Sequence, residues 1–334
     1  MLKNRYTMKN RTLMSLAVVA VGLGGLAAGC GGDDEGGGGG GGEELSGTIT
    51  LDGSSTVAPL SESAAELFQQ ENPGVRVTVG TSGTGGGFEK FCRGETDISN
   101  ASRPIDDEEA AACEGDGIAF EQVSVANDAL SVIVNPENDW AQCLTVEQLN
   151  TIWDRGSNVD NWNQVDPSFP DEPLELFGPG TDSGTFDYFT DAINGEEGVQ
   201  RTDYNNIGED DNAAVTGVAG NRGAMGYLGY SFFAENTDKV KAVEIDGGQG
   251  CVAPSPEAAQ DGSYTPLGRQ LFIYPSDKAL AKSEVQAFVE FYINENDAIA
   301  ERAGIIPLND EQKQEALDKV ASLVGGGGGT ETAE

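Results

Sequence analysis

Hydrophobic and polar positions along the chain follow two periods, and each change of period predicts a new element. Alternation with period two predicts strands within 47–57 and at 75–79, and a long β-branched run predicts a strand over 122–136. Spacings of three and four predict helices such as 57–71 and 310–323. Further strands are expected at 96–102, 174–178, 223–230, 240–245 and 268–275, and further helices at 86–93, 106–113, 145–154, 184–193, 212–220 and 283–295. This alternation predicts α/β organisation with mainly parallel sheets.

Three loops of similar composition follow predicted strands and precede predicted helices. They read DGSSTVAPL (52–60), TSGTGGGFEKF (81–91) and GTDSGTFDYF (180–189). Helix N-termini carry unpaired amides and partial positive charge, glycines allow close approach, and hydroxyls add donors. The loops together therefore predict a cage of donors for a small tetrahedral oxyanion. Taken singly, each loop is equally explained by ordinary N-caps and turns.

The N-terminal segment is typical of an export signal. Four basic residues precede an apolar stretch at 13–28, and LAAGC at 26–30 resembles a bacterial lipobox. We expect a signal peptide at 1–29 and a lipid on Cys30 that anchors the protein to the outer face of the cytoplasmic membrane. A glycine-rich and acidic tether is expected at 30–45, and a disordered tail at 325–334. A transmembrane anchor is the alternative for the apolar stretch.

Composition excludes several classes of function. Removal of residues 1–29 takes the formal net charge from −37 to −41, because four basic and no acidic residues are lost. Such a charge argues against binding to nucleic acid or anionic lipid. The chain has no histidine, which excludes Ser-His-Asp and Cys-His catalysis. The glycine loops lack the Gly-Lys-Ser/Thr of a P-loop, so no cofactor is expected, and a Ser-Lys hydrolase remains a formal alternative.

Four motifs in order resemble a known family. DGSSTVAPL, TSGTGGGFEKFCRGETDISNASRPI, GPGTDSGTFDYFTDAI and GAMGYLGYSFF look like the substrate-binding proteins of the high-affinity phosphate ABC transporter, the PstS family. The resemblance runs from about residue 46 to 324. It implies a two-lobed periplasmic-binding-protein fold of type II that closes on phosphate. It also implies permease and ATPase subunits as partners, and we expect a monomer that is not an enzyme.

The resemblance assigns contacts to the three loops. Thr56 and the amide of Val57 match the first phosphate-contacting loop, with Ser55 beside them, and Ser82 matches the second. The third match comprises Ser183, Gly184 and Thr185.

The chain departs from the family at two positions. Arg103 stands where well-known members have an aspartate that accepts a proton from the ligand. Those members also have an arginine shortly before the third loop, where this chain reads GPGTD. Arg103 follows a strand, so we expect it to contact the ligand. The alternative is a surface pair with Asp106 or Asp107. Asp182 and Gly83 are expected next to the contact residues, with Asp182 as a partial replacement for the missing aspartate.

The two-lobed fold predicts the domain bounds and the disulfides. One lobe is expected at 46–126 plus 268–324 and the other at 127–267, with crossover strands at 124–134 and 269–275. Four cysteines remain beside Cys30. Pairing Cys92–Cys113 and Cys143–Cys251 keeps each bridge inside one lobe and leaves the hinge free. Free thiols are one alternative, and a zinc site lacks a CxxC pair.

The sequence leaves more than one class of function open. The leading interpretation is a phosphate receptor that delivers its ligand to a permease. The alternatives are a phosphate sensor or surface adhesin on the same fold, and a receptor for sulfate, molybdate or phosphonate.

Overall fold

The computed structural model describes residues 44–326. The predicted signal peptide, Cys30 and nearly all of the tether lie outside it, as does the tail beyond residue 326. Between residues 44 and 326, no helix combines the length and apolar character needed to cross a membrane.

The elements alternate along the chain as the pattern predicts. The strands are β1 Gly47–Gly53, β2 Val75–Val79, β3 Ile98–Ala101, β4 Val123–Val134, β5 Cys143–Thr145, β6 Glu175–Gly178, β7 Asn205–Asn206, β8 Ala224–Gly229, β9 Lys241–Ala242, β10 Glu244–Asp246, β11 Cys251–Val252 and β12 Gly268–Pro275. The helices are α1 Ala58–Glu71, α2 Thr84–Cys92, α3 Asp107–Gly115, α4 Val146–Trp153, α5 Trp162–Val165, α6 Gly184–Phe189, α7 Asp211–Gly220, α8 Tyr230–Ala234, α9 Pro256–Gln260, α10 Asp277–Leu280, α11 Ser283–Asn294, α12 Asn296–Ala303 and α13 Asp310–Gly326. A π-helical turn, η1 (Thr190–Asn194), continues α6.

One sheet runs through the whole described body. Its strand order is β2-β1-β3-β12-β4-β8-β6-β7, with β9 paired beside β4, and a second sheet has the order β11-β10-β5. The outer pairs β1/β2, β1/β3, β6/β8 and β6/β7 are parallel. The pairs that join β3, β12, β4 and β8 are antiparallel, so the sheets are mixed rather than mainly parallel.

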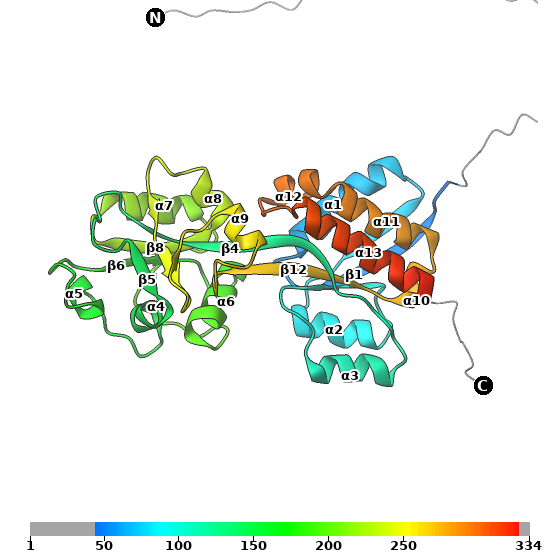
Figure 1. The fold of residues 1–334 in the computed structure, drawn as a ribbon, viewed down its shortest axis with the longest axis horizontal. Helices are drawn as coiled ribbons and strands as arrows, with labels where there is room; N and C mark the ends of the chain where they lie inside the picture. Colours follow the sequence, from blue (N-terminus) through cyan, green and yellow to red (C-terminus); the bar gives the residue numbers. More distant parts are fainter. Residues whose placement is uncertain (1–43, 327–334) are drawn as a thin grey trace, which may run out of the picture. The chain divides into compact units, whose positions relative to one another are not determined.

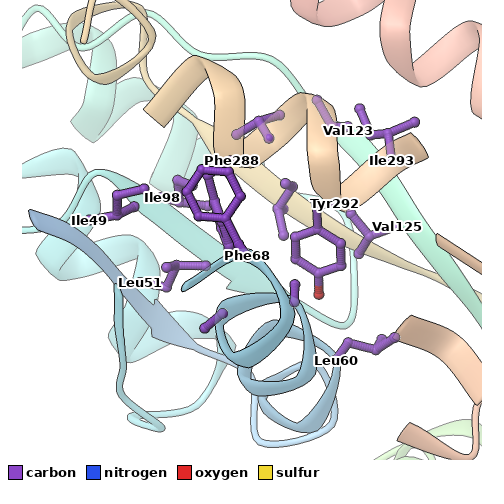
Figure 2. Packing of buried hydrophobic residues seen from close by; sticks show 14 of the residues in the cluster. Ile49, Leu51, Leu60, Phe68, Ile98, Val123, Val125, Phe288, Tyr292 and Ile293 are labelled. Carbon is purple, nitrogen blue, oxygen red and sulfur yellow. The ribbon is translucent and has the colours of Figure 1, made fainter. Parts of the chain in front are cut away.

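Two large apolar cores define two lobes. The first core is built from β1–β3, α1 and α11–α13, and Figure 2 shows its centre, where Phe68 packs beside Phe288 and Tyr292. The second core is built from β5, β6, β8, α4 and α6. Burial of these side chains is the main stabilising contribution to each lobe.

Strands β4 and β12 carry the chain between the two cores, and Figure 1 shows them running side by side between the two groups of helices. Val123, Val125 and Ala126 of β4 belong to the first core. The apolar residues that follow pack into the second core or its neighbouring cluster: Ala129, Leu130, Val132, Ile133 and Val134. The protein thus has the expected two-lobed fold with two crossover strands.

Both disulfides form as predicted. Cys92 at the end of α2 is bonded to Cys113 of α3, and Cys143 of β5 is bonded to Cys251 of β11. The first bond joins two helices of one apolar cluster, and the second joins two strands of the smaller sheet.

Several element boundaries differ from the prediction. α2 begins at Thr84 instead of residue 86, and the helix expected over 184–193 ends at Phe189, where η1 takes over. Helix α12 was not predicted, because only Ile299 and Ala300 among its apolar residues, together with Asn296, are buried. Two adjacent apolar positions do not produce the spacing of three and four residues that predicts a helix.

Candidate functional site

A cleft of about 590 Å³ brings all three predicted loops together. It is lined from both lobes and from the crossover strand β12, so it lies where the lobes meet. The lining residues are Ser54, Ser55, Thr56, Ser82, Gly83, Thr84, Gly85, Gly86, Ser102, Arg103, Pro104, Gly184, Asp187, Tyr188, Asp191, Glu197, Arg269, Gln270 and Phe272. Hydroxyls, glycines and charged side chains dominate this lining.

The first and third loops approach each other closely from opposite lobes. A Cβ atom built on Gly184 would lie 3.0 Å from Thr56 Oγ1 and 3.7 Å from Ser55 Oγ. A real side chain at residue 184 would therefore crowd the first loop. Glycine at this position permits the two lobes to come within hydrogen-bonding range of one small ligand.

The second loop presents an uncapped helix N-terminus to the cleft. Gly83 is the N-cap of α2 with φ of 80°, and no side chain caps the helix. Within the described residues, the amides of Thr84, Gly85 and Gly86 have no hydrogen-bond acceptor. Three converging donors at the positive end of a helix form a local anion-binding geometry.

Ser82, just before that helix, is held by a carboxylate. Its backbone N–H and its Oγ donate to Asp52 Oδ1 at 3.0 and 2.6 Å, and Lys90 pairs with the other oxygen of Asp52. Burial raises the pKa of Asp52, but the hydrogen bonds from Lys90 and Ser82 outweigh it and lower the pKa below its usual value. The ionised carboxylate thereby fixes the second loop against β1.

The other predicted contact residues flank the cleft. Ser183 Oγ accepts the Thr185 N–H at 3.3 Å as the N-cap of α6, which leaves the Ser183 hydroxyl proton for another acceptor. Val57 is fully buried at the start of α1. These three residues adjoin the lining residues Thr56 and Gly184 but do not line the cleft in this structure. Asp182 is exposed and also lies outside the lining.

Arg103 lines the cleft but is already paired. Its Nη1 and Nη2 donate to the two carboxylate oxygens of Glu109 at 2.8 Å each, and Nη1 also donates to Pro104 O. Glu109 also raises the Arg103 pKa. The partner is thus Glu109, not Asp106 or Asp107, and Glu109 also completes the capping box of α3.

A second arginine, which the sequence analysis did not select, lies deeper in the cleft. Arg269 of β12 has a side chain 20% exposed, against 45% for Arg103. Its Nη2 donates to Thr56 Oγ1 at 3.3 Å and to Asp128 Oδ2 at 3.2 Å. Its guanidinium carbon lies 3.6 Å from the ring centre of Tyr188.

Three carboxylates from the second lobe add negative charge to the lining of the cleft. Asp187, Asp191 and Glu197 line the cleft. Burial and the nearby Glu197 raise the pKa of Asp187, while Arg269 lowers it by less. Among the residues described, no group of three or more acidic or cysteine side chains is arranged to hold a metal ion.

The sequence did carry a signal for Arg269 and Asp128. Each is a charged residue inside an otherwise apolar strand that we expected to cross between lobes, and their charges are opposite. Their pairing depends on strand register across 141 residues of sequence, which no local pattern encodes. Asp187 and Tyr188 follow Gly184 by about one helical turn, so helical spacing would have placed them beside it.

The fold and the cleft define a two-lobed binding protein with a polar, donor-rich site. A profile of the PBP superfamily domain matches residues 39–296. The chain is 46% identical over 263 residues to Protein SphX of Synechococcus elongatus, covering 78% of this chain and 77% of that protein.

Two further similar proteins are named as phosphate-binding proteins. The phosphate-binding protein PstS of Staphylococcus saprophyticus is 37% identical over 308 residues, covering 92% of this chain and 93% of that protein. The crystal structure of a "possible phosphate binding protein" from Planctomyces limnophilus superposes with a TM-score of 0.79 at 45% identity, covering 84% of this chain and 99% of that one. The chain therefore belongs to the PstS family of the PBP superfamily.

Proposed function

We propose that this protein is an extracytoplasmic receptor that binds inorganic phosphate in the cleft between its lobes and delivers it to an ABC permease. The observation that carries the proposal is the uncapped N-terminus of α2, where three amides without acceptors face the cleft. A small anion satisfies all three at once, and hydroxyls of the other two loops surround the same space.

The proposed contact set joins the three loops. Oxygen atoms of the ligand accept hydrogen bonds from hydroxyls and from backbone amides at three helix N-termini. To the amides of Thr84, Gly85 and Gly86 the proposal adds the residues predicted from the sequence, which are Ser55, Thr56, Val57, Ser82, Arg103, Ser183, Gly184 and Thr185. Support comes from the cleft lining for five of them and from direct sequence adjacency for Val57, Ser183 and Thr185.

Calorimetric titration of residues 44–326 with phosphate, arsenate and sulfate tests the proposal. We expect saturable 1:1 binding of phosphate and arsenate, because both carry protons near neutral pH that a cleft with carboxylates can accept. We expect much weaker binding of sulfate, whose oxygens cannot donate to Asp187. Tight sulfate binding without phosphate binding would refute the proposal in favour of a sulfate receptor.

The domain bounds belong to the same proposal. One lobe comprises 46–126 plus 268–324, and the other comprises 127–267, with β4 and β12 as the hinge. The division of β4 between the two cores supports it. Small-angle scattering with and without phosphate should report compaction on binding. Identical profiles at saturating phosphate would argue against a hinge that closes.

Anchoring by a lipid on Cys30 is also part of the proposal, supported by the LAAGC sequence. Cys30→Ser should release the full chain from membranes without altering phosphate affinity. A variant that stays with the membrane would refute the lipid anchor while leaving the receptor role intact.

We further propose that the protein is not an enzyme. The absence of histidine from the sequence and the role of Ser183 as a helix cap support this. Turnover of phosphoesters that Ser183→Ala abolishes would refute it.

A further inference from the structure

Arg269 occupies the point at which the crossover strands pass from one core to the other. Leu267 packs into the second core and Leu271 into the first, so Arg269 lies between them. In the strand register Arg269 is opposite Asp128, which lies at the same transition in β4. A side chain at this level is positioned by both lobes.

The guanidinium of Arg269 contacts one residue of each lobe. Its Nη2 lies 3.3 Å from Thr56 Oγ1 of the first loop. Its Cζ lies 3.6 Å from the ring centre of Tyr188 on α6. Tyr188 is itself fixed, because it is 6% exposed and its hydroxyl donates to Pro266 O at 2.9 Å. Cation–π contacts of this kind gain strength when the pair is desolvated.

The hydrogen-bonding capacity of Arg269 is only partly used. Nε and Nη2 both donate to the single oxygen Asp128 Oδ2, at 3.3 and 3.2 Å. In the part of the chain that the structure describes, Nη1 has no acceptor. Arg103 differs, because both of its terminal nitrogens donate to Glu109 at 2.8 Å and the pair is more exposed to solvent.

We propose that Arg269, rather than Arg103, supplies the principal positive charge to the oxyanion, with Asp128 and Tyr188 as its positioning residues. The inference rests on the proposed function, because it concerns the same cleft. Nη1 donates to a ligand oxygen, while the Thr56 hydroxyl, beside Nη2, donates to the same anion. A guanidinium held in place before binding loses little entropy when the ligand arrives.

The acidic residues of the cleft explain why such a charge is required. Asp187, Asp191 and Glu197 line the same space as the three loops and repel an anion. Amides and hydroxyls carry no full positive charge to offset that repulsion. Each arginine has a carboxylate partner, but Glu109 takes both terminal nitrogens of Arg103, whereas Asp128 leaves Nη1 of Arg269 without an acceptor among the described residues. The less exposed Arg269 is screened less by solvent than Arg103 is, so its charge acts more strongly on the ligand.

The test compares the two arginines by phosphate calorimetry on wild type, Arg269→Gln and Arg103→Gln. A fourth protein, Asp128→Asn/Arg269→Gln, removes the cation without leaving Asp128 as an unpaired carboxylate, so it retains a neutral strand pair. Thermal unfolding of each protein confirms that it is folded. We expect Arg269→Gln and the double variant to weaken binding roughly 10- to 150-fold, the scale of a lost hydrogen bond to a charged group. Arg103→Gln should weaken it less.

Two results would overturn the inference. One is a folded double variant that binds phosphate within about three-fold of wild type. The other is a larger loss in Arg103→Gln than in Arg269→Gln, which would return the principal charge to Arg103. In both cases wild type still binds phosphate, so the proposed function survives. Absence of binding by wild type would instead refute the proposed function and this inference together.

Discussion

Arg269 and Asp128 face each other across the two strands that join the lobes, with the guanidinium 3.2 Å from the carboxylate. Both side chains are mostly shielded, at 20% and 16% exposure. A charge pair placed between two crossover strands is costly to desolvate, so by itself it is weak evidence for stability. Arg269 contacts Thr56 of the first loop and the ring of Tyr188 on α6. The pair therefore links the crossover strands to the cleft.

The Tyr188 ring should contribute to affinity through Arg269. Tyr188→Leu removes the aromatic face under the guanidinium, and we expect phosphate affinity to fall about 2- to 30-fold, corresponding to about 0.5–2 kcal/mol. Tyr188→Phe is the matched control, because it keeps the ring and loses only the hydrogen bond to Pro266 O. That variant should lose about 1 kcal/mol of unfolding free energy and keep its affinity.

Calorimetry and denaturant unfolding of the two Tyr188 variants separate these effects. Equal affinities for Tyr188→Leu and Tyr188→Phe would show that the ring is only part of the core and does not position Arg269.

Gly184 should be required for the approach of the first and third loops. Gly184→Ala places a methyl group 3.0 Å from Thr56 Oγ1, so the Thr56 side chain or the third loop must shift by a few tenths of an ångström. Overpacking of this kind costs about 1–3 kcal/mol, and we expect phosphate affinity to fall about 5- to 150-fold. Unfolding stability should change little, because alanine suits the first turn of α6.

Gly115→Ala is the control for Gly184→Ala. Gly115 ends α3, and a Cβ there would meet no atom within 4 Å. Its affinity should equal that of wild type. If Gly184→Ala also bound like wild type, the first and third loops would not need to approach this closely around the ligand.

The site was predictable where chemistry is local and unpredictable where it depends on register. The loops at Thr56, Ser82 and Gly184 follow from strand-loop-helix order, because helix N-termini gather at one edge of the sheet. The sequence suggested that the glycines of the second loop let an anion approach the backbone, but Gly87 is also required for packing. Its added Cβ would lie 2.5 Å from Gly53 Cα, so α2 lies directly against the end of β1. Neither this packing nor the Arg269–Asp128 register can be read from spacing along one strand.

The same reasoning applies to the fold. Long elements with strong periodicity, such as β4 and α13, were predicted within a few residues. The antiparallel centre of the sheet was not predicted. β3 and β12 are far apart in the sequence, and their relative direction depends on how the chain crosses twice between the lobes. The pairing of the cysteines was predictable once two lobes were assumed, because only one arrangement keeps both bonds within lobes.

Asp211 should make the folded state less stable as pH rises. Burial, with Glu209 and Asp210 nearby, raises its pKa from 3.8 to about 6. Well below pH 3.8 the carboxyl is protonated in the folded and unfolded states and has no effect. Between pH 4 and 6 the unfolded chain ionises first, so unfolding becomes easier, and above pH 6 the full cost remains.

Asp211→Asn should therefore raise the unfolding free energy at pH 7 by about 1 kcal/mol, after allowance for solvent screening, and raise it much less at pH 4. Asp107→Asn is the matched control, because Asp107 is exposed and begins α3 as Asp211 begins α7. Thermal unfolding of both variants from pH 4 to 8 measures the difference. A constant gain across that range would assign the effect to helix propensity rather than to ionisation.

The two disulfides should separate stability from binding. The Cys143–Cys251 bond spans 108 residues and the Cys92–Cys113 bond spans 21. In the loop-entropy account these contribute about 5 and about 3 kcal/mol, so the Cys143→Ser/Cys251→Ser variant should be the less stable. For phosphate affinity we expect the opposite order, with the larger loss in the Cys92→Ser/Cys113→Ser variant. The Cys92–Cys113 bond joins α2, whose N-terminus lines the cleft, to α3, which carries Glu109 beside Arg103. Denaturant unfolding and calorimetry on both double-serine variants give the two orders. If the same bond ranked first in both, the Cys92–Cys113 bond would not hold the anion-binding end of α2 in place.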